Sequence, residues 1–287
     1  MRKDRFEQTI QLKDGRSLGY AEYGASGGKP VFSFHGFPSS RIDWPLFDTD
    51  GIAERLNARI IAADRPGYGL SDFKPGRKIL DWPDEVVELA DALQIDRFAG
   101  LGISGGGPYA LACAHGIPER LTKTAIVCGM GPVDAPGAKD GGAMLLSSKS
   151  ALMRKLLLAL MAMGLRRNPD RFLSQMKDAV AEPDKLLLTQ SVVVQTFVDS
   201  MLEAFRSGTR GASWETVLYK RPWGYQLQDI SMQIYLWHGG LDTQVPISVG
   251  QYVAKTVPGC QAKFFPDEGH LSLAHNHIEE ILSALIV

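Results

Sequence analysis

A serine set among glycines is the first feature of the sequence that could do chemistry. Residues 102–106 read Gly-Ile-Ser-Gly-Gly, between an apolar run at 97–103 and a helix-forming stretch at 108–115. A G-x-S-x-G sequence between a strand and a helix is typical of a sharp turn that exposes its serine as a nucleophile. We therefore predict a strained turn at Ser104, where the Gly105 N–H can bind a developing oxyanion. The alternative is a glycine-rich turn whose serine has no chemical role.

A serine nucleophile needs a base, and the base needs a carboxylate that orients it. Without such partners a serine hydroxyl is a weak nucleophile at neutral pH. Asp242 follows an apolar run at 233–237, and His270 follows another at 261–265. Because the carboxyl ends of parallel strands meet at one edge of a sheet, we expect Ser104, Asp242 and His270 to converge there.

Short apolar runs alternate with amphipathic stretches in the first half of the chain. The Asp-Gly pair at 14–15 lies between two extended runs and predicts a tight antiparallel turn. We predict hairpin strands at 6–12 and 17–23, buried parallel strands at 31–35, 58–63, 97–103 and 124–128, and helices at 82–93 and 108–115. This alternation predicts an α/β fold with a mostly parallel sheet.

The alternation stops near residue 131 and resumes at Ile234. The segment 131–228 is rich in leucine and methionine at helical spacing, and glycine and proline divide it into several helices. After it we predict a strand at 233–237, a helix from 246, a strand at 261–265 and a helix at 273–286. The predicted organisation is therefore a core of residues 1–130 and 229–287 with a helical lobe at 131–228.

Composition excludes several classes of protein. The 287 residues contain 31 Lys and Arg and 32 Asp and Glu, a net charge of -1 that offers nucleic acid no broad positive field. The 3 cysteines include no C-x-x-C pair and favour a reducing compartment, so we expect a cytoplasmic protein. Residues 1–10 lack the apolar region of a secretory signal, and the most apolar run, 156–165, is too short to span a membrane. We expect a soluble enzyme with no membrane span and no nucleic-acid partner.

These motifs, in this order, resemble those of the α/β-hydrolase superfamily along almost the whole chain. They are the N-terminal hairpin, the glycine-rich turn at 100–107, Gly-Gly-Leu-Asp-Thr-Gln-Val-Pro at 239–246 and Asp-Glu-Gly-His at 267–270. The resemblance implies that Ser104 is the nucleophile, His270 the general base and then acid, and Asp242 its orienting partner. It also implies that residues 131–228 are a helical cap inserted after the sixth strand. Asp134 is the alternative acid, because some members carry the acid after that strand.

The loop at 35–41 reads His-Gly-Phe-Pro-Ser-Ser-Arg. The resemblance implies that the backbone N–H of Phe37 joins that of Gly105 to form the oxyanion hole. A His-Gly-x-Pro loop is similar to that of epoxide hydrolases, haloalkane dehalogenases and cofactor-free haloperoxidase-like esterases. The first two attack with an aspartate, whereas position 104 is serine, so the esterase-like members fit better.

Other histidines are predicted to have structural roles. His35 and His238 end buried strands, where we expect them to hydrogen-bond to backbone groups. His275 and His277 are two residues apart, so they point in different directions on a helix. Without a cluster of cysteines or carboxylates beside them they form no metal site, and we predict neither a metal nor a cofactor.

The predicted function is that of a serine hydrolase that cleaves a carboxylic ester, or a lactone or thioester, of a small, partly apolar substrate through an acyl-enzyme. Phe37 and, from the cap, Met161 and Phe197 are predicted to contact the substrate; the alternative for the cap side chains is helix packing. Two alternative functions use the same framework. One is a lyase or a perhydrolase-like enzyme, and the other is a sensor that binds a small molecule under the cap. Nothing in the sequence indicates an oligomeric state.

Overall fold

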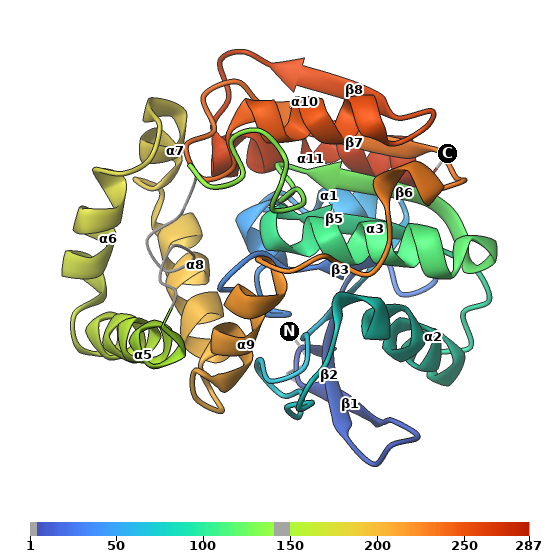
Figure 1. The fold of residues 1–287 in the computed structure, drawn as a ribbon, viewed down its shortest axis with the longest axis horizontal. Helices are drawn as coiled ribbons and strands as arrows, with labels where there is room; N and C mark the ends of the chain where they lie inside the picture. Colours follow the sequence, from blue (N-terminus) through green and yellow to red (C-terminus); the bar gives the residue numbers. More distant parts are fainter. Residues whose placement is uncertain (1–4, 141–149, 287) are drawn as a thin grey trace.

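An eight-stranded sheet crosses the centre of the computed structural model, which describes residues 5–140 and 150–286 (Figure 1). Its strands are β1 (Gln8–Gln11), β2 (Ser17–Gly24), β3 (Lys29–Phe34), β4 (Ala58–Ala63), β5 (Phe98–Ile103), β6 (Leu121–Val127), β7 (Ile234–Gly239) and β8 (Gln261–Phe265). They lie in the order β1-β2-β4-β3-β5-β6-β7-β8. β2 is antiparallel to β1 and to β4, and the pairs from β4 to β8 are parallel. The predicted α/β fold with an antiparallel N-terminal hairpin is confirmed.

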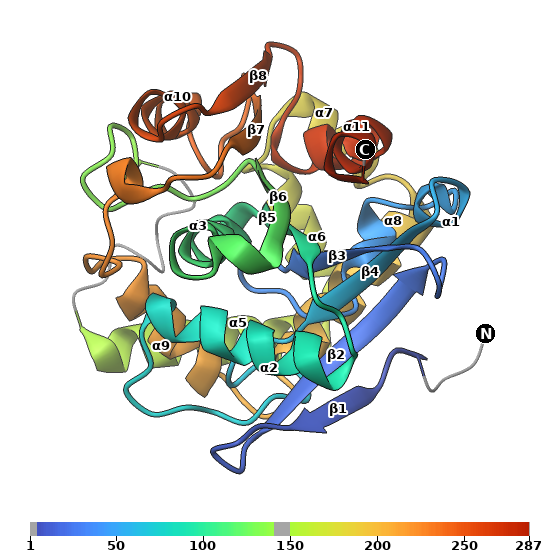
Figure 2. The ribbon, with the colours of Figure 1, turned by 90° about the vertical axis from the view of Figure 1, so that its right-hand side faces the viewer.

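Helices cover both faces of the sheet (Figure 2). One face carries α2 (Trp82–Ala92), α3 (Gly107–Gly116) and α10 (Ile247–Thr256), and the other carries α1 (Ile52–Arg55) and α11 (His270–Ile286). Side chains of one strand alternate between the two cores: on β3, Phe32 and Phe34 pack with the first group of helices and Val31 packs with the second. Burial on both faces explains why these strands read as continuous apolar runs.

In the described residues, five α-helices lie between β6 and β7. They are α5 (Ala151–Arg167), α6 (Pro169–Lys177), α7 (Glu182–Leu187), α8 (Ser191–Ala204) and α9 (Arg210–Leu218). Figure 1 shows them together on the left, beyond the carboxyl ends of the strands. Leu165 and Val198 pack within this group, whereas Leu158 packs against Tyr68 of the core. Residues 1–4, 141–149 and 287 of the predicted core and lobe lie outside the described residues.

Buried and partly buried ion pairs tie two of these helices to loops at the edge of the sheet. Glu203 of α8 pairs with Arg41 at 2.6 Å, and Glu215 of α9 pairs with Arg65 at 2.8 Å and also with Arg77. The side chains of Arg65 and Glu215 have no exposed area. Removing one partner of such a pair leaves an uncompensated charge in the interior, so these contacts fix α8 and α9 on the core.

Two predicted boundaries are wrong for identifiable reasons. α11 begins at His270 and not at 273, because a carboxylate described below satisfies its first N–H groups. β6 begins at Leu121 and not at 124. Thr122 is exposed and Lys123 is half-buried, so the first residues of the strand do not form an apolar run in the sequence.

Short 3₁₀ helices occupy Trp44–Leu46, Ile79–Asp81, Ser104–Gly106, Pro118–Arg120 and Leu227–Asp229. Within 5–140 and 150–286, no helix has the length and apolar character that crossing a membrane requires.

Candidate active site

Ser104 lies on a sharp turn that joins β5 to α3. Its φ angle is 53°, in the left-handed region, which costs a residue with a side chain on the order of 1–3 kcal/mol. A Cβ atom at Gly102 would lie 2.6 Å from the carbonyl oxygen of Gly106, and one at Gly106 would overlap the carbonyl oxygen of Phe34. Only glycine fits these two positions, so the structure has the strained turn that the motif predicts.

The three side chains predicted to do chemistry form one hydrogen-bonded line at the edge of the sheet. His270 Nε2 is 2.9 Å from Ser104 Oγ, and His270 Nδ1 is 2.7 Å from Asp242 Oδ2. The other oxygen of Asp242 accepts the backbone N–H groups of Gln244 and Val245, both at 2.8 Å. The carboxylate is thus fixed from one side while it holds the imidazole from the other.

Burial and charge shift the pKa values of the acid and the base. Burial disfavours the imidazolium form of His270, but the Asp242 carboxylate and then Asp184 outweigh it, so the pKa of His270 lies above its ordinary value. Burial likewise disfavours ionised Asp242, but His270 and then His238 hold the pKa of Asp242 below its ordinary value. Asp242 is therefore a carboxylate at neutral pH, and His270 is a stronger base than an isolated imidazole.

The alternative acid is placed differently. Asp134 is exposed, whereas Asp242 is only 6% exposed and takes the Nδ1 hydrogen bond of His270. His238, for which the sequence predicts a structural role, is buried, with its Nε2 2.8 Å from the carbonyl oxygen of Val245. The geometry favours Asp242 over Asp134 as the partner of the histidine.

A thiol that the sequence analysis did not single out lies beside this pair. Potential ligand atoms of Cys128, Asp242 and His270 lie within 4.8 Å of one another. Burial, and then Asp242, raise the pKa of the Cys128 thiol well above its ordinary value. A protonated thiol is a poor metal ligand, and Asp242 and His270 already bond to each other. The absence of a metal and of a cofactor stays a prediction.

The loop that carries Phe37 is held against the Ser104 turn by Arg65. The guanidinium donates hydrogen bonds to the carbonyl groups of His35 and Gly36, the latter at 2.9 Å. His35 contacts the backbone at both ring nitrogens, as predicted. Its Nε2 accepts the N–H of Arg65 at 3.2 Å. The proton is therefore on Nδ1, which donates to the carbonyl oxygen of Gly36 at 2.9 Å. A Cβ atom at Gly105 would lie 3.2 Å from Phe37 N, so the two segments predicted to supply oxyanion donors are adjacent.

Asp184 on α7 is a site residue that sequence reasoning missed. Its buried carboxylate accepts the backbone N–H groups of His270 at 2.9 Å, Leu271 at 3.0 Å and Ser272 at 2.9 Å. A carboxylate at the first turn of a helix is favourable because it satisfies free N–H groups. Asp184 therefore holds the start of α11, and with it His270, although 86 residues separate the two in the chain. No local sequence pattern carries that information.

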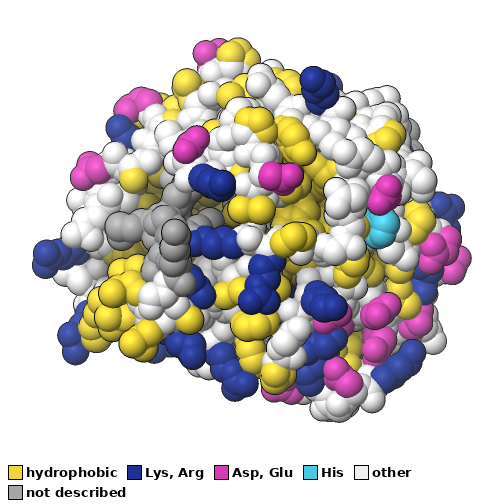
Figure 3. All heavy atoms as spheres, in the orientation of Figure 1, with side chains coloured by type: hydrophobic (Ala, Val, Ile, Leu, Met, Phe, Trp, Pro, Cys, Tyr) yellow, Lys and Arg dark blue, Asp and Glu magenta, His cyan; other side chains and the backbone are white. Residues whose placement is uncertain are grey.

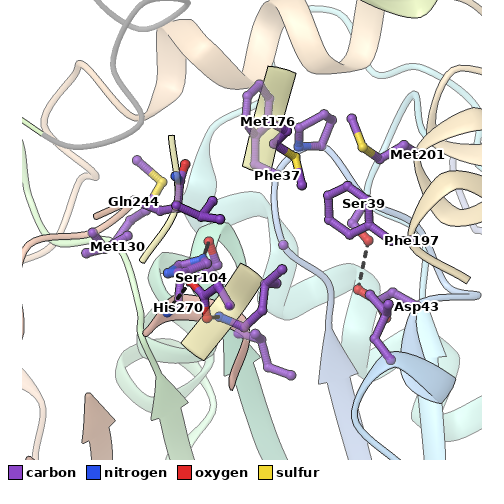
Figure 4. Close-up of a pocket in the computed structure, with 18 of the residues that line it drawn as sticks. Phe37, Ser39, Asp43, Ser104, Met130, Met176, Phe197, Met201, Gln244 and His270 are labelled. Carbon is purple, nitrogen blue, oxygen red and sulfur yellow. Dashed lines mark hydrogen bonds between the residues drawn. The ribbon is translucent and has the colours of Figure 1, made fainter. Parts of the chain in front are cut away.

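A cavity of about 310 Å³ opens onto Ser104 and His270 (Figure 4). The three predicted substrate-contacting residues, Phe37, Met161 and Phe197, all line it. Apolar lining residues that the sequence did not single out include Leu46, Phe47, Met130, Phe172, Met176 and Met201. The cavity is thus an apolar space formed jointly by the edge of the sheet and by α5, α6 and α8.

Comparison with known proteins agrees with the fold. A profile of the alpha/beta hydrolase family matches residues 31–284. The chain belongs to this family. Among curated relatives of this alpha/beta hydrolase, a non-heme chloroperoxidase of Streptomyces lividans is 33% identical over 131 residues, 44% of this chain and 45% of that protein.

A second curated relative matches over more of the chain. A dihydrolipoyllysine-residue acetyltransferase component of the acetoin cleaving system of Cupriavidus necator is 26% identical over 261 residues, 90% of this chain and 63% of that protein. The alpha/beta hydrolase described here therefore spans less than two thirds of the length of either of these relatives.

Solved structures share the alpha/beta hydrolase fold along nearly all of the chain. An esterase from Exiguobacterium antarcticum superposes with a TM-score of 0.70 at 20% identity, over 98% of this chain and 99% of that one. A bromoperoxidase from Bacillus anthracis also has a TM-score of 0.70, at 18% identity, over 97% and 98% of the two chains. At such identities the likeness shows a common fold, and the chemistry has to be argued from the site.

Proposed function

We propose that this alpha/beta hydrolase is a serine esterase that cleaves a carboxylic ester of a small, partly apolar molecule through an acyl-enzyme. The observation that carries the proposal is the line from Ser104 Oγ through His270 to Asp242, with contacts of 2.9 and 2.7 Å. A serine with such partners becomes nucleophilic because the histidine takes its proton as the bond to carbon forms. The apolar lining of the cavity supports a substrate with an apolar part.

In acylation, Ser104 Oγ attacks the carbonyl carbon and its proton passes to His270 Nε2. Asp242 stabilises the imidazolium through Nδ1–H, and the N–H groups of Phe37 and Gly105 bind the negatively charged oxygen. The intermediate then expels the alcohol, which takes the proton from His270. The acyl group remains bonded to Ser104.

In deacylation, a water molecule takes the place of the alcohol. His270 accepts one proton of the water as its oxygen attacks the acyl carbon, and it returns that proton to Ser104 Oγ as the carboxylic acid leaves. A thioester follows the same steps with a thiol as leaving group, and a lactone differs only in that its alcohol stays attached to the acyl chain. All three substrates therefore fit the same residues.

The helices of residues 131–228 act in this proposal as a cap over the reacting groups. Met161 on α5 and Phe197 on α8 line the cavity together with Phe37 of the core loop. Burial of apolar substrate surface against them contributes roughly 0.8 kcal/mol for each methylene. The cap therefore selects the substrate, whereas the edge of the sheet performs the reaction.

A second candidate is a perhydrolase, which the 33% identical chloroperoxidase favours because a peracid can oxidise a halide ion. In that reaction hydrogen peroxide attacks the acyl-enzyme in place of water. One proton of the peroxide passes through His270 to Ser104 Oγ, and a peracid leaves. The same residues serve both reactions, so only the acceptor of the acyl group differs.

A fluorophosphonate probe and a panel of short p-nitrophenyl esters test the proposal. We expect the probe to label Ser104, identified by peptide mass spectrometry, and we expect a rapid first release of p-nitrophenol that Ser104→Ala abolishes. Peracid formed when hydrogen peroxide is added would favour the second candidate. Labelling of another serine would contradict the role of Ser104 in both candidates. Ligand binding without any turnover would contradict both and favour the sensor alternative.

A further inference from the structure

The buried carboxylate of Asp43, at the cavity, differs in its partners from two other buried carboxylates. Asp64 pairs with Arg41 at 2.9 Å, and Glu215 pairs with Arg65 at 2.8 Å. Asp43 is only 2% exposed, yet in the described part of the chain no cationic nitrogen lies within 4.0 Å of its carboxylate. The charge of Arg65 favours ionised Asp43 without contacting it, and a buried carboxylate with no cation in contact is unfavourable when ionised, so this carboxylate calls for a further partner.

The Asp43 side chain does not cap the helix that follows it. It stands just before the 3₁₀ helix Trp44–Leu46, where an aspartate commonly accepts a backbone N–H, but it makes no such bond. Its Oδ2 instead accepts the hydroxyl of Ser39 at 2.9 Å. Asp43 and Ser39 both line the cavity, and Figure 4 shows them on the side away from Ser104 and His270.

The cap fixes the position of this polar pair. Ser39 Oγ is 2.7 Å from Ser200 Oγ on α8, and the Ser40 hydroxyl donates to the Ser200 carbonyl oxygen at 2.9 Å. Phe197 and Met201, from the same helix, lie over the pair in Figure 4. On this side of the cavity, the core and the cap together hold a group of hydrogen-bonding atoms beside apolar side chains.

We propose that Asp43 and Ser39 bind a hydroxyl or ammonium group of the substrate, separated from its ester carbonyl by an apolar segment. This inference rests on the proposed esterase function, since it places the carbonyl at Ser104. A bound hydrogen-bond donor satisfies the carboxylate, and the apolar wall contacts the segment between the two ends. The preferred ester thus carries a polar group at the end remote from the scissile bond.

The ionisation of Asp43 is consistent with this assignment. Burial raises the pKa of Asp43 to about 7, although the hydrogen bond from Ser39 and then the charge of Arg65 oppose the rise. A donor supplied by a ligand would stabilise the ionised form, which the protein stabilises only in part.

Esters matched in length but not in end group test the inference. The p-nitrophenyl esters of heptanoic, 6-hydroxyhexanoic and 6-aminohexanoic acid differ only in a terminal methyl, hydroxyl or ammonium group. We expect kcat/KM to be about tenfold higher for at least one polar end than for the methyl end, because a hydrogen bond to a carboxylate is lost with the methyl group. Heptyl and 6-hydroxyhexyl acetate repeat the comparison for the alcohol side. Equal or lower values for the polar ends in both series would overturn the inference.

Variants assign the preference to Asp43. Asp43→Leu should reverse the ratio of polar to methyl end, and Asp43→Asn should reduce it most for the ammonium ester. The matched control is Asp48→Asn: Asp48 belongs to the same loop and binds the N–H groups of Ile52 and Ala53, but it does not line the cavity. A ratio that Asp48→Asn changes as much as Asp43→Asn would contradict the role of Asp43.

A binding experiment separates this inference from the esterase proposal. Calorimetry on Ser104→Ala should show tighter binding of 1,6-hexanediol or 6-amino-1-hexanol than of 1-heptanol, and Asp43→Asn in that background should remove the difference. If no ester is cleaved but this preference is present, the polar site is supported and the esterase proposal fails. If esters are cleaved but neither polar alcohol binds more tightly than 1-heptanol, the polar site fails alone.

Discussion

The edge of the sheet and the helices above it are built by different kinds of contact. At the edge, Ser104 and His270 stand where strands end, and backbone turns and hydrogen bonds of 2.7 to 2.9 Å set their positions. In the cap, Met161 and Phe197 face the cavity because of how α5 and α8 pack against their neighbours. A change at the edge should therefore affect the reaction itself, whereas a change in the cap should affect which substrate reacts.

The largest effect is expected at the nucleophile. Ser104→Ala should lower kcat for p-nitrophenyl esters by about six orders of magnitude, because the acyl-enzyme cannot form. Fluorophosphonate labelling should disappear as well, which mass spectrometry of the intact protein measures. A variant with unchanged labelling would mean that the reactive serine lies elsewhere and that the edge has been wrongly assigned.

The orienting acid is expected to give the next largest effect. Asp242→Asn should lower kcat by about 10⁴, because an amide holds His270 in the wrong tautomer. Asp134→Asn, the control at an exposed carboxylate, should leave kcat within about twofold. The opposite pattern in steady-state kinetics would move the acid to the loop after β6.

Asp184 of the cap holds His270 at the edge of the sheet. Substitutions there are expected to lower kcat less than those above and to shift the pH dependence of kcat/KM. The raised pKa of His270 predicts that kcat/KM falls with acidification at a pH above the ordinary histidine value, because the base must be unprotonated. Asp184→Asn removes a negative charge near His270, so that limb of the pH profile should move to lower pH. Asp184→Ala also removes three hydrogen bonds at the start of α11 and should lower kcat by up to about 10².

The matched control is Asp170→Asn, an exposed carboxylate near the start of another cap helix. It should leave the pH profile where it is. An equal shift in both variants would show that general charge, and not the contact between Asp184 and α11, determines the pKa of His270.

The smallest effects are expected for pocket side chains. Met161→Trp and Phe197→Trp should shorten the preferred acyl chain, with a loss of about fourfold in relative kcat/KM for each methylene excluded. Labelling of Ser104 should persist in both. Met163→Trp on α5 and Val192→Trp on α8 are the controls, since both residues are exposed, and an ester panel should rank substrates for them as for the unchanged protein.

The sequence predicted the edge better than the cap for a physical reason. Ser104, Asp242 and His270 each follow a short apolar run, and the geometry of a parallel sheet brings such positions together. Asp184 was not predictable, because its role depends on a contact between distant segments.

Periodicity in α5 shows the same limit within one helix. Leu158 is packed against Tyr68, Met161 lines the cavity, and Met163 is 41% exposed, yet all three belong to one leucine- and methionine-rich pattern. Figure 3 shows hydrophobic side chains gathered at the lower left of the surface, where α5 lies in Figure 1. The large exposed apolar residues of α5 are Leu152, Met153, Leu156, Leu160 and Met163. A helical repeat of apolar residues indicates that a helix has an apolar face, but it does not indicate which part of the protein packs against that face.

The buried ion pairs between α9 and the core have a consequence for how the protein unfolds locally. If α9 left the sheet, Arg65 and Arg77 would lose Glu215 while still buried, a change that costs about 3–5 kcal/mol for one such pair. Arg65 also holds the carbonyl groups of the loop after β3, so the loop would loosen at the same time. In native-state hydrogen exchange, the amides of α9 should therefore open together with those of the central strands, as part of one cooperative folding unit, although α9 is inserted between two strands in the sequence.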